Sequence, residues 1–338
     1  MRAMVLRAAG DLAAADVETP APGPDEVLVR VTHSAICGTD LKIFTGAIPV
    51  GYPRIMGHEM SGEVVGGYDG QRLERGDRVV VDPVAYCGAC FNCRAGQTNL
   101  CPTGALLGRD ADGGFAEYVV APRTHVFRLP ETIDPRAAPA IQVLTTCVHA
   151  QRRANIFPAQ SVVVVGLGVT GQLHAQLAKA RGAYPVIGIT RSAWKRKLAE
   201  ELGADITLPA GDDAIRRVLE ATGGRGPDVV IETTGIVRSI ADAITMARLG
   251  GTLVLFGITT AAEGALPFYQ LYFKELNVVN ARAAKGEDFP DSIDLVARGV
   301  VKLLPLVTQV MPVSELGPAI DMLKTDVDGR MKIILEHR

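Results

Sequence analysis

The segment Ser161-Val-Val-Val-Val-Gly166-Leu-Gly168-Val-Thr-Gly171 places three glycines directly after a run of buried-type valines. In this G-x-G-x-x-G pattern the first glycine makes a tight turn, the second lets the backbone approach a pyrophosphate, and the third lets strand and helix pack closely. A helix is predicted over 172–181, and its N-terminus would offer free N–H groups to phosphates. The segment therefore predicts a dinucleotide site built from Gly166, Gly168, Val169, Thr170 and Gly171.

Short apolar runs alternate with amphipathic stretches on both sides of this motif. Such alternation is typical of a parallel sheet in a doubly wound α/β domain, which we expect over residues 145–283. The expected strands are 161–165, 185–189, 228–232 and 252–256, and the expected helices are 172–181, 193–202 and 239–247.

The flanking regions have a different texture. Residues 1–144 contain short β-rich runs separated by Gly and Pro clusters, which predicts a mostly β unit with long loops. Residues 284–338 offer two helical patterns, 289–298 and 313–324, and a last strand, 331–335. This tail is short for a domain, so we expect it to pack back on the first one.

The end of the second expected strand indicates which dinucleotide binds. An NAD site usually places Asp or Glu about 20 residues after the glycines, where this chain has Thr190. Without that carboxylate a ribose 2′-phosphate is not repelled, Arg191 can bind it bidentately, and Ser192 and Lys195 can add donors. The sequence therefore favours NADP(H) over NAD(H), the alternative being that Arg191 is a solvated surface charge.

Cys87, Cys90, Cys93 and Cys101 have C-x2-C-x2-C-x7-C spacing. Four thiolates within one loop can enclose a tetrahedral Zn²⁺ and leave no position for a substrate. We therefore expect residues 87–101 to form a lobe whose zinc is structural.

Composition excludes several other classes of function. The 338 residues carry a net charge of -2 and no basic stripe, which argues against nucleic acid as a partner and favours a small molecule. No run of about 18 uncharged apolar residues and no signal peptide is evident, so we expect a cytoplasmic protein without a membrane anchor. Four of the six cysteines have metal-ligand spacing, which favours reduced thiols over disulfides.

Two further fragments, Cys37-Gly-Thr39-Asp40 and Gly57-His58-Glu59, carry metal-ligand residue types. Together with the cysteine loop, the glycine motif, and the segments 76–79 (GDRV) and 113–118 (GGFAEY), they resemble the zinc-dependent medium-chain dehydrogenases. This is the family of alcohol, sorbitol and threonine dehydrogenases, and the resemblance covers essentially the whole chain. It implies a GroES-like catalytic domain (1–144) into which a Rossmann domain (145–283) is inserted, with residues 284–338 returning to the first domain.

The resemblance implies a second, catalytic zinc. It makes Cys37 and His58 ligands, with Glu59 as a ligand or a close outer carboxylate. Gln142 falls where alcohol dehydrogenases have a second Cys and sorbitol-type members have Glu, so it either binds through its amide oxygen or leaves the place to water. Cys147, further along the same helix, is better read as a buried apolar thiol.

The resemblance also assigns residues that handle protons. Asp40 would receive the ring N–H of His58, and Thr39 would contact the substrate oxygen and pass its proton outward. Lys42 stands where alcohol dehydrogenases often have a relay histidine. It is either a relay group with a depressed pKa, or a solvated cation or phosphate contact.

The implied reaction is hydride transfer between a hydroxyl-bearing carbon and a nicotinamide. The resemblance places the nicotinamide against Thr146 and the segment Gly257-Ile258-Thr259, and it adds Thr234 and Arg282 to the cofactor residues. Gln142 and the polar Thr39/Lys42 neighbourhood favour a secondary alcohol, a polyol or a sugar. The family also implies a homodimer or homotetramer, and the segment 268–273 (FYQLYF) either shapes the pocket or serves as core and subunit contact.

Parts of the sequence are also compatible with three other functions. One is a simple alcohol or threonine-type dehydrogenase that uses NAD. A second is the zinc-free quinone reductase branch of the superfamily, which lacks both cysteine constellations. The third is a zinc-ribbon binding module, which would leave the glycine motif unexplained.

Overall fold

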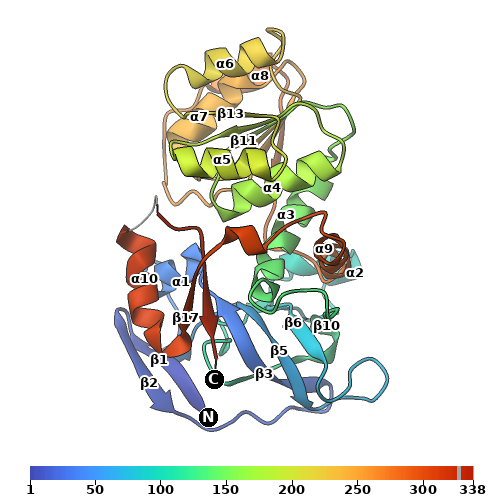
Figure 1. The fold of residues 1–338 in the computed structure, drawn as a ribbon, viewed down its shortest axis with the longest axis vertical. Coiled ribbons are helices and arrows are strands. Elements are labelled where there is room, and N and C mark those ends of the chain that lie inside the picture. Colours follow the sequence, from blue (N-terminus) through green and yellow to red (C-terminus); the bar gives the residue numbers. More distant parts are fainter. Residues whose placement is uncertain (326–328, 338) are drawn as a thin grey trace. The chain divides into compact units, whose positions relative to one another are not determined.

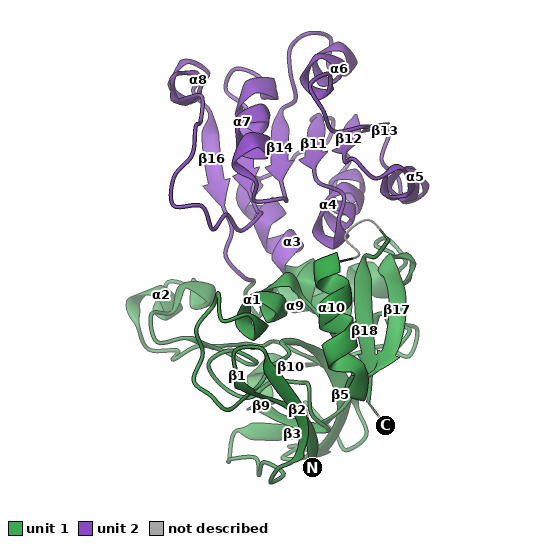
Figure 2. Ribbon diagram, turned by 90° about the vertical axis from the view of Figure 1, so that its left-hand side faces the viewer, with its two compact units in different colours: residues 1–145, 284–338 green, residues 146–283 purple. Residues whose placement is uncertain are grey.

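The structure is a computed structural model that describes residues 1–325 and 329–337. Two compact units divide the chain, and the first contains both ends: residues 1–145 and 284–338 form unit 1, while 146–283 form unit 2 (Figure 2). No helix of the described residues is both long and apolar enough to cross a bilayer.

Unit 1 is built mainly from β-strands, as the spacing of its apolar residues predicts. Its strands are β1 (Arg2–Ala8), β2 (Asp11–Asp16), β3 (Glu26–Ala35), β4 (Arg54–Ile55), β5 (Glu59–Gly66), β6 (Arg78–Val81), β7 (Val84–Ala85), β8 (Ala105–Leu106), β9 (Tyr118–Pro122), β10 (Val126–Arg128), β17 (Val307–Pro312) and β18 (Lys332–Glu336). Its helices are α1 (Gly38–Phe44), α2 (Phe91–Arg94), α9 (Asp288–Ala297) and α10 (Leu316–Thr325).

The central sheet of unit 1 joins the two ends of the chain. Among the described residues its order is β10-β6-β5-β3-β18-β17, and β9 also pairs with β3 (Figure 1). β18 runs antiparallel to β3 and parallel to β17. The C-terminal strand β18 is therefore separated only by β3 from β5, the strand that begins at Glu59.

Unit 2 is an open α/β layer structure. Its parallel strands are β11 (Val162–Val165), β12 (Val186–Ile189), β13 (Ile206–Leu208), β14 (Val229–Glu232), β15 (Thr252–Leu255) and β16 (Asn277–Asn280). Its helices are α4 (Val169–Ala180), α5 (Ala193–Glu201), α6 (Ala214–Ala221), α7 (Val237–Met246) and α8 (Phe268–Phe273), and α3 (Ile141–Ala154) runs into it. The strand order β13-β12-β11-β14-β15-β16 is that of a dinucleotide-binding sheet.

Both faces of this sheet are covered because successive side chains of a strand point to opposite faces. Val162 and Val164 of β11 pack with α3, α4 and α5, whereas Val163 and Val165 pack with α6 and α7. A strand buried on both faces must be apolar throughout, which explains the unbroken valine run.

Several elements differ from those expected. The helix predicted over 172–181 begins at Val169, because the glycine motif itself forms the first turn, with Gly168 at the N-cap. The helix expected over 313–324 begins with a short 3₁₀ turn and becomes α10 at Leu316. Four elements were not expected from the sequence: β13, α6, β16 and β17. Of these, β13 and β16 have only three and four residues.

Candidate functional site

The first candidate site lies in unit 1 where α1 and β5 begin. One ligand atom from each of Cys37, His58 and Glu59 lies within 4.8 Å of the others. Cys37 is the N-cap of α1, whereas His58 and Glu59 are buried at the start of β5. The structure thus brings together three residues that two separate sequence fragments supply.

Gly57 sets the direction in which the chain enters this site. Its φ of 95° lies in the left-handed region, and a Cβ there would stand 2.6 Å from the Phe115 ring. Only glycine fits both requirements without strain. The backbone can therefore turn tightly just before His58.

Asp40 holds two of the candidate ligands in place. One carboxylate oxygen accepts a hydrogen bond from the Cys37 N–H at 2.8 Å, and the other lies 3.3 Å from Nδ1 of His58. Burial alone lowers the pKa of His58, but the charges of Asp40 and the Cys37 thiol raise it well above its ordinary value. With Nδ1 turned to Asp40, the other ring nitrogen is left for a ligand.

Glu59 has a partner that the sequence analysis missed. Nζ of Lys332, at the start of β18, lies 2.5 Å from Oε2 of Glu59, and both side chains are almost fully buried. Nothing local in the sequence signals this pair, because Lys332 follows an ordinary run of charged and apolar residues.

Buried polar atoms without partners indicate that this cluster fits a metal. Among the described residues, Oε1 of Glu59 has no hydrogen-bond partner. Leaving such an atom unsatisfied costs about 1–3 kcal/mol, which a bound cation would remove. A thiolate, an imidazole and a carboxylate form a donor set that suits Zn²⁺.

Gln142 and Thr39 both belong to unit 1, and Thr39 lies two residues after Cys37 on α1. Gln142 is buried two residues after the 3₁₀ helix Ala138–Ala140, which packs against β3 and β5. Thr39 and Lys42 are half-buried and stand one helical turn apart on α1. Lys42 has no ion-pair partner among the described residues, whereas Cys147 is fully buried in α3 and its pKa is raised by burial.

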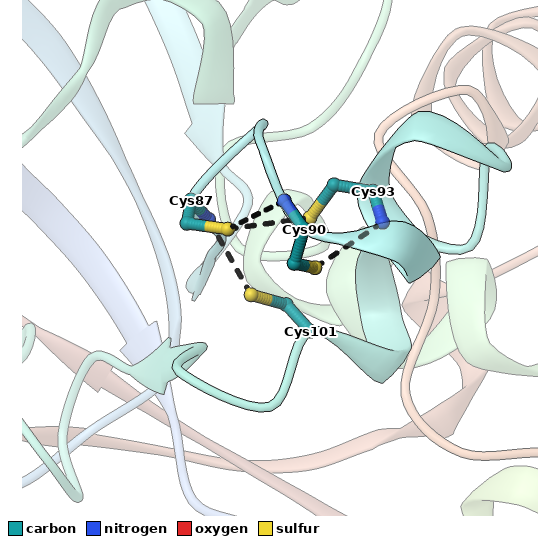
Figure 3. A group of neighbouring side chains, drawn as sticks. All are labelled: Cys87, Cys90, Cys93 and Cys101. Carbon is teal, nitrogen blue, oxygen red and sulfur yellow. Dashed lines mark hydrogen bonds between the residues drawn. The ribbon is translucent and has the colours of Figure 1, made fainter.

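The second candidate site is the loop of Cys87, Cys90, Cys93 and Cys101, whose sulfurs lie within 4.8 Å of one another (Figure 3). Backbone N–H groups of Cys87, Cys90 and Cys93 point at neighbouring sulfurs at 3.3–3.4 Å. Such bonds, from Ala89 and Cys90, lower the pKa of Cys87 to about 6, whereas burial raises the pKa of Cys93 to about 12. Four sulfurs at this spacing can hold one zinc without an open position.

The third candidate site is the carboxyl edge of the unit 2 sheet. The glycine motif follows β11, Thr190-Arg191-Ser192 follows β12, and Thr234 and Gly257-Ile258 follow β14 and β15. In parallel α/β sheets ligands bind at this edge, where the strand order reverses beside β11. Thr146 is half-buried at the start of the unit 2 part of α3, and Arg282 is exposed after β16.

The turn after β12 is ordered by Arg196. Its guanidinium donates to the carbonyl oxygens of Thr190 and Arg191 at 2.9 and 2.8 Å. The Arg191 side chain is exposed and has no carboxylate partner among the described residues. Lys195, expected to add a donor, is buried, and its Nζ lies 5.3 Å from the centre of the Trp194 ring.

Two glycines of the motif should respond differently to alanine. A Cβ on Gly171 would stand 1.8 Å from the Gly166 carbonyl oxygen, whereas one on Gly168 would meet no atom within 4 Å. We expect Gly171→Ala to lower the melting temperature by several degrees or prevent folding, because helix and strand must separate. Gly168→Ala should melt like the parent protein but bind the dinucleotide at least about tenfold more weakly. Equal melting temperatures for the two variants would contradict this account of Gly171.

Comparisons with known proteins agree with this geometry. Residues 23–131 match the model of an alcohol dehydrogenase GroES-like domain, and residues 169–298 match that of a zinc-binding dehydrogenase. The L-galactonate-5-dehydrogenase of Escherichia coli (strain K12) is 35% identical over 89% of this chain and 88% of its own. The sorbitol dehydrogenase of Halalkalibacterium halodurans is 32% identical over 94% and 97%. The crystal structure of a zinc-binding dehydrogenase from Sinorhizobium meliloti, bound to NADP, is 33% identical, with a TM-score of 0.93 over 99% and 98%.

Proposed function

Because this chain belongs to the zinc-dependent medium-chain dehydrogenases, we propose that it interconverts a secondary hydroxyl of a polyol or sugar derivative and the corresponding carbonyl. The observation that carries this proposal is the cluster of half-buried Cys37 with buried His58 and Glu59, in which a carboxylate oxygen is unsatisfied. A bound zinc would supply Lewis acidity that lowers the pKa of the substrate hydroxyl.

The surrounding residues provide orientation and a route for the proton. Asp40 holds Cys37 through its backbone and His58 through its ring, so both ligands are fixed before substrate arrives. Thr39 has a hydroxyl that can accept the substrate proton and pass it on. Gln142, which is buried, would supply a neutral amide oxygen as a further ligand.

Sugar derivatives are the favoured substrates for two reasons. The relatives named above act, by their names, on L-galactonate and on sorbitol, and a third, 30% identical, is a D-arabitol-phosphate dehydrogenase. In addition, Thr39 and Lys42 give α1 a polar side beside the metal cluster. All three names specify polyhydroxylated chains, and two of them specify an acidic group.

An oxidation screen tests this proposal directly. The purified, zinc-loaded protein is offered polyols, aldonates, phosphorylated polyols and simple secondary alcohols with NADP⁺ or NAD⁺, and reduced cofactor is followed by absorbance. We expect kcat/KM for at least one polyol or sugar acid to exceed that for 2-propanol by at least about 100-fold, since several hydroxyls can hydrogen-bond. A preference for 2-propanol over every polyhydroxylated compound would refute the substrate class.

NADP(H) is the proposed cofactor, with Arg191 as the residue that selects it. Arg191→Ala should raise the Kd for NADPH about 10–100-fold, because a charge-assisted contact to the 2′-phosphate is lost, and change the Kd for NADH less than about twofold. Both constants can be measured by titrating nicotinamide fluorescence. Lys197→Ala, which removes an exposed cation of the adjacent α5, is the matched control. If Arg191→Ala weakened the binding of NADPH and NADH equally, Arg191 would not select between the two cofactors.

We also propose two zinc ions per chain. The first would occupy the cluster of Cys37 and His58, and the second would occupy the four-cysteine lobe. Elemental analysis of the purified protein should give a zinc to protein ratio near two.

A homo-oligomer is proposed, with the α8 and β16 surface as the subunit contact. β16 pairs with β15 on one side and with no described strand on the other, while Tyr269, Tyr272 and Phe273 of α8 are 61–83% exposed. One reading of the sequence placed these aromatic side chains in the core, but the structure exposes them. An open edge beside an apolar helix suits a second copy related by a two-fold axis.

The contact predicts the effect of a charge at its centre. Val278→Lys on β16 should shift the protein to monomer in light scattering, because two lysines would face each other across a two-fold axis. Lys197→Glu, on another part of the same unit, should leave the mass unchanged. An unaltered oligomer in Val278→Lys would place the contact elsewhere.

A further inference from the structure

Lys332 is an unusual residue to find beside a metal cluster. Its side chain is 4% exposed, and Nζ lies 2.5 Å from Oε2 of Glu59 and 3.3 Å from the carbonyl oxygen of Ile36. Buried lysines are rare unless they are paired, and a buried pair whose partner is removed becomes strongly destabilising. The two charges therefore depend on each other.

The sheet explains how a C-terminal residue reaches the cluster. Ile334 of β18 and Glu59 of β5 both pair with Ala35, from opposite sides of β3. The Ile36 N–H donates to the Ile333 carbonyl, which extends the pairing by one residue toward Cys37. Lys332 therefore stands across from the start of α1, with its side chain directed at Glu59.

The two oxygens of Glu59 have different surroundings. Both oxygens are buried, but Oε2 lies 2.5 Å from the Lys332 ammonium, whereas Oε1 has neither an ion-pair nor a hydrogen-bond partner among the described residues. A carboxylate that is free at both oxygens can bind a cation through one or both of them. One that is held by an ammonium at Oε2 has a single oxygen left to offer.

We propose that Lys332 is a positioning residue that restricts Glu59 to one oxygen in the coordination of zinc. This inference rests on the proposed function, because it assumes that zinc is held by Cys37, His58 and Glu59. Restriction to one oxygen limits the number of protein donor atoms on the metal, so that the substrate hydroxyl can still bind. It also offsets the negative charge of Glu59, so that the metal stays a stronger Lewis acid.

The geometry makes a prediction about the metal that does not involve turnover. In Lys332→Met, Glu59 is released and can bind the metal with both oxygens. The Co²⁺-substituted protein should then show the weaker visible bands of five-coordinate cobalt instead of the intense bands of four-coordinate cobalt. A chelator should also remove the metal about tenfold more slowly. This change lies within the range of effects on metal affinity that residues bonded to metal ligands typically have.

Matched variants separate this role from a general effect on folding. Lys332→Arg keeps the cation and should keep the parent spectrum, and Lys324→Met removes a surface lysine of α10 that pairs with Asp321. The double variant Glu59→Gln/Lys332→Met has neither buried charge and should fold even if Lys332→Met does not. With Gln at position 59, the spectrum and the release rate should be the same for Lys and Met at position 332.

The outcomes distinguish this inference from the proposed function. A parent-like cobalt spectrum and parent-like release in Lys332→Met would overturn the role of Lys332, and so would a difference between Lys and Met that persists with Gln at position 59. A protein that gives the expected cobalt spectra but oxidises no polyol would refute the proposed substrate class and leave the role of Lys332 intact.

Discussion

Cys37→Ala and His58→Asn are each expected to reduce kcat/KM by at least about 10³-fold, which corresponds to about 4 kcal/mol of lost transition-state stabilisation. Either change removes a ligand from a cluster of three protein side chains in which one carboxylate oxygen is already unpaired. Binding of NADPH should stay within about threefold of the parent, because the glycine motif and Arg191 belong to the other unit. Turnover assays measure kcat/KM, elemental analysis measures the bound zinc, and nicotinamide fluorescence measures the binding of NADPH.

Cys147→Ala is the matched control for Cys37→Ala. Cys147 is also a free thiol, but it is fully buried in α3 and belongs to neither group of metal-ligand side chains. It should lower stability by about 1 kcal/mol and leave the zinc content and kcat/KM unchanged. Normal activity in a zinc-free Cys37→Ala protein would contradict a catalytic metal at this cluster.

Cys93→Ala should destabilise the four-cysteine lobe and remove its zinc. The thiol of Cys93 is buried at the centre of the lobe and lies 3.9 Å from the sulfur of Cys87. Structural zinc supplies about 10–16 kcal/mol in small zinc-binding peptides, so a lobe with three cysteines should fail to order. We expect one zinc fewer per chain, rapid proteolysis between residues 87 and 101, and a melting temperature lower by several degrees, as differential scanning fluorimetry can measure.

Turnover separates a structural role of this lobe from a catalytic one. For the fraction of Cys93→Ala that stays folded, kcat should lie within about twofold of the parent. Phe91→Ala is the matched control, because Phe91 stands in the same loop but is 83% exposed. If kcat fell 100-fold while proteolysis and melting temperature were unchanged, the lobe would have a part in the chemistry.

The fold class was predictable because its strongest signals are local. A glycine turn after a valine strand, and four cysteines within one loop, each fix a geometry over fewer than 20 residues. The expected GroES-like and Rossmann-type domains are confirmed by the family models and by the solved structure with a TM-score of 0.93. Elements without a local signal, such as β13 and β17, were missed because tertiary pairing stabilises them.

The site was only partly predictable. The sequence identified Cys37, His58 and Glu59 as ligand types, and the structure brings their ligand atoms within 4.8 Å of one another. It suggested Lys195 as an added donor for the cofactor phosphate, which stays a prediction, and it did not indicate that Lys195 is buried in α5. A helix shows only one face to solvent, and periodicity alone did not fix which face Lys195 occupies.

The sequence by itself determined the chemistry that is available: four thiols for one zinc, a second set of ligand types, a glycine turn for a dinucleotide, and Thr190 in place of a carboxylate with Arg191 beside it. Only the tertiary structure decided which groups act on one another. Lys332 lies 296 residues from Ile36 along the chain, and β18 brings it beside Glu59 by pairing with β3. Residues so far apart in sequence meet only through the order and register of the strands. Burial of whole strands sets that order and register, and no sequence pattern near either residue indicates it.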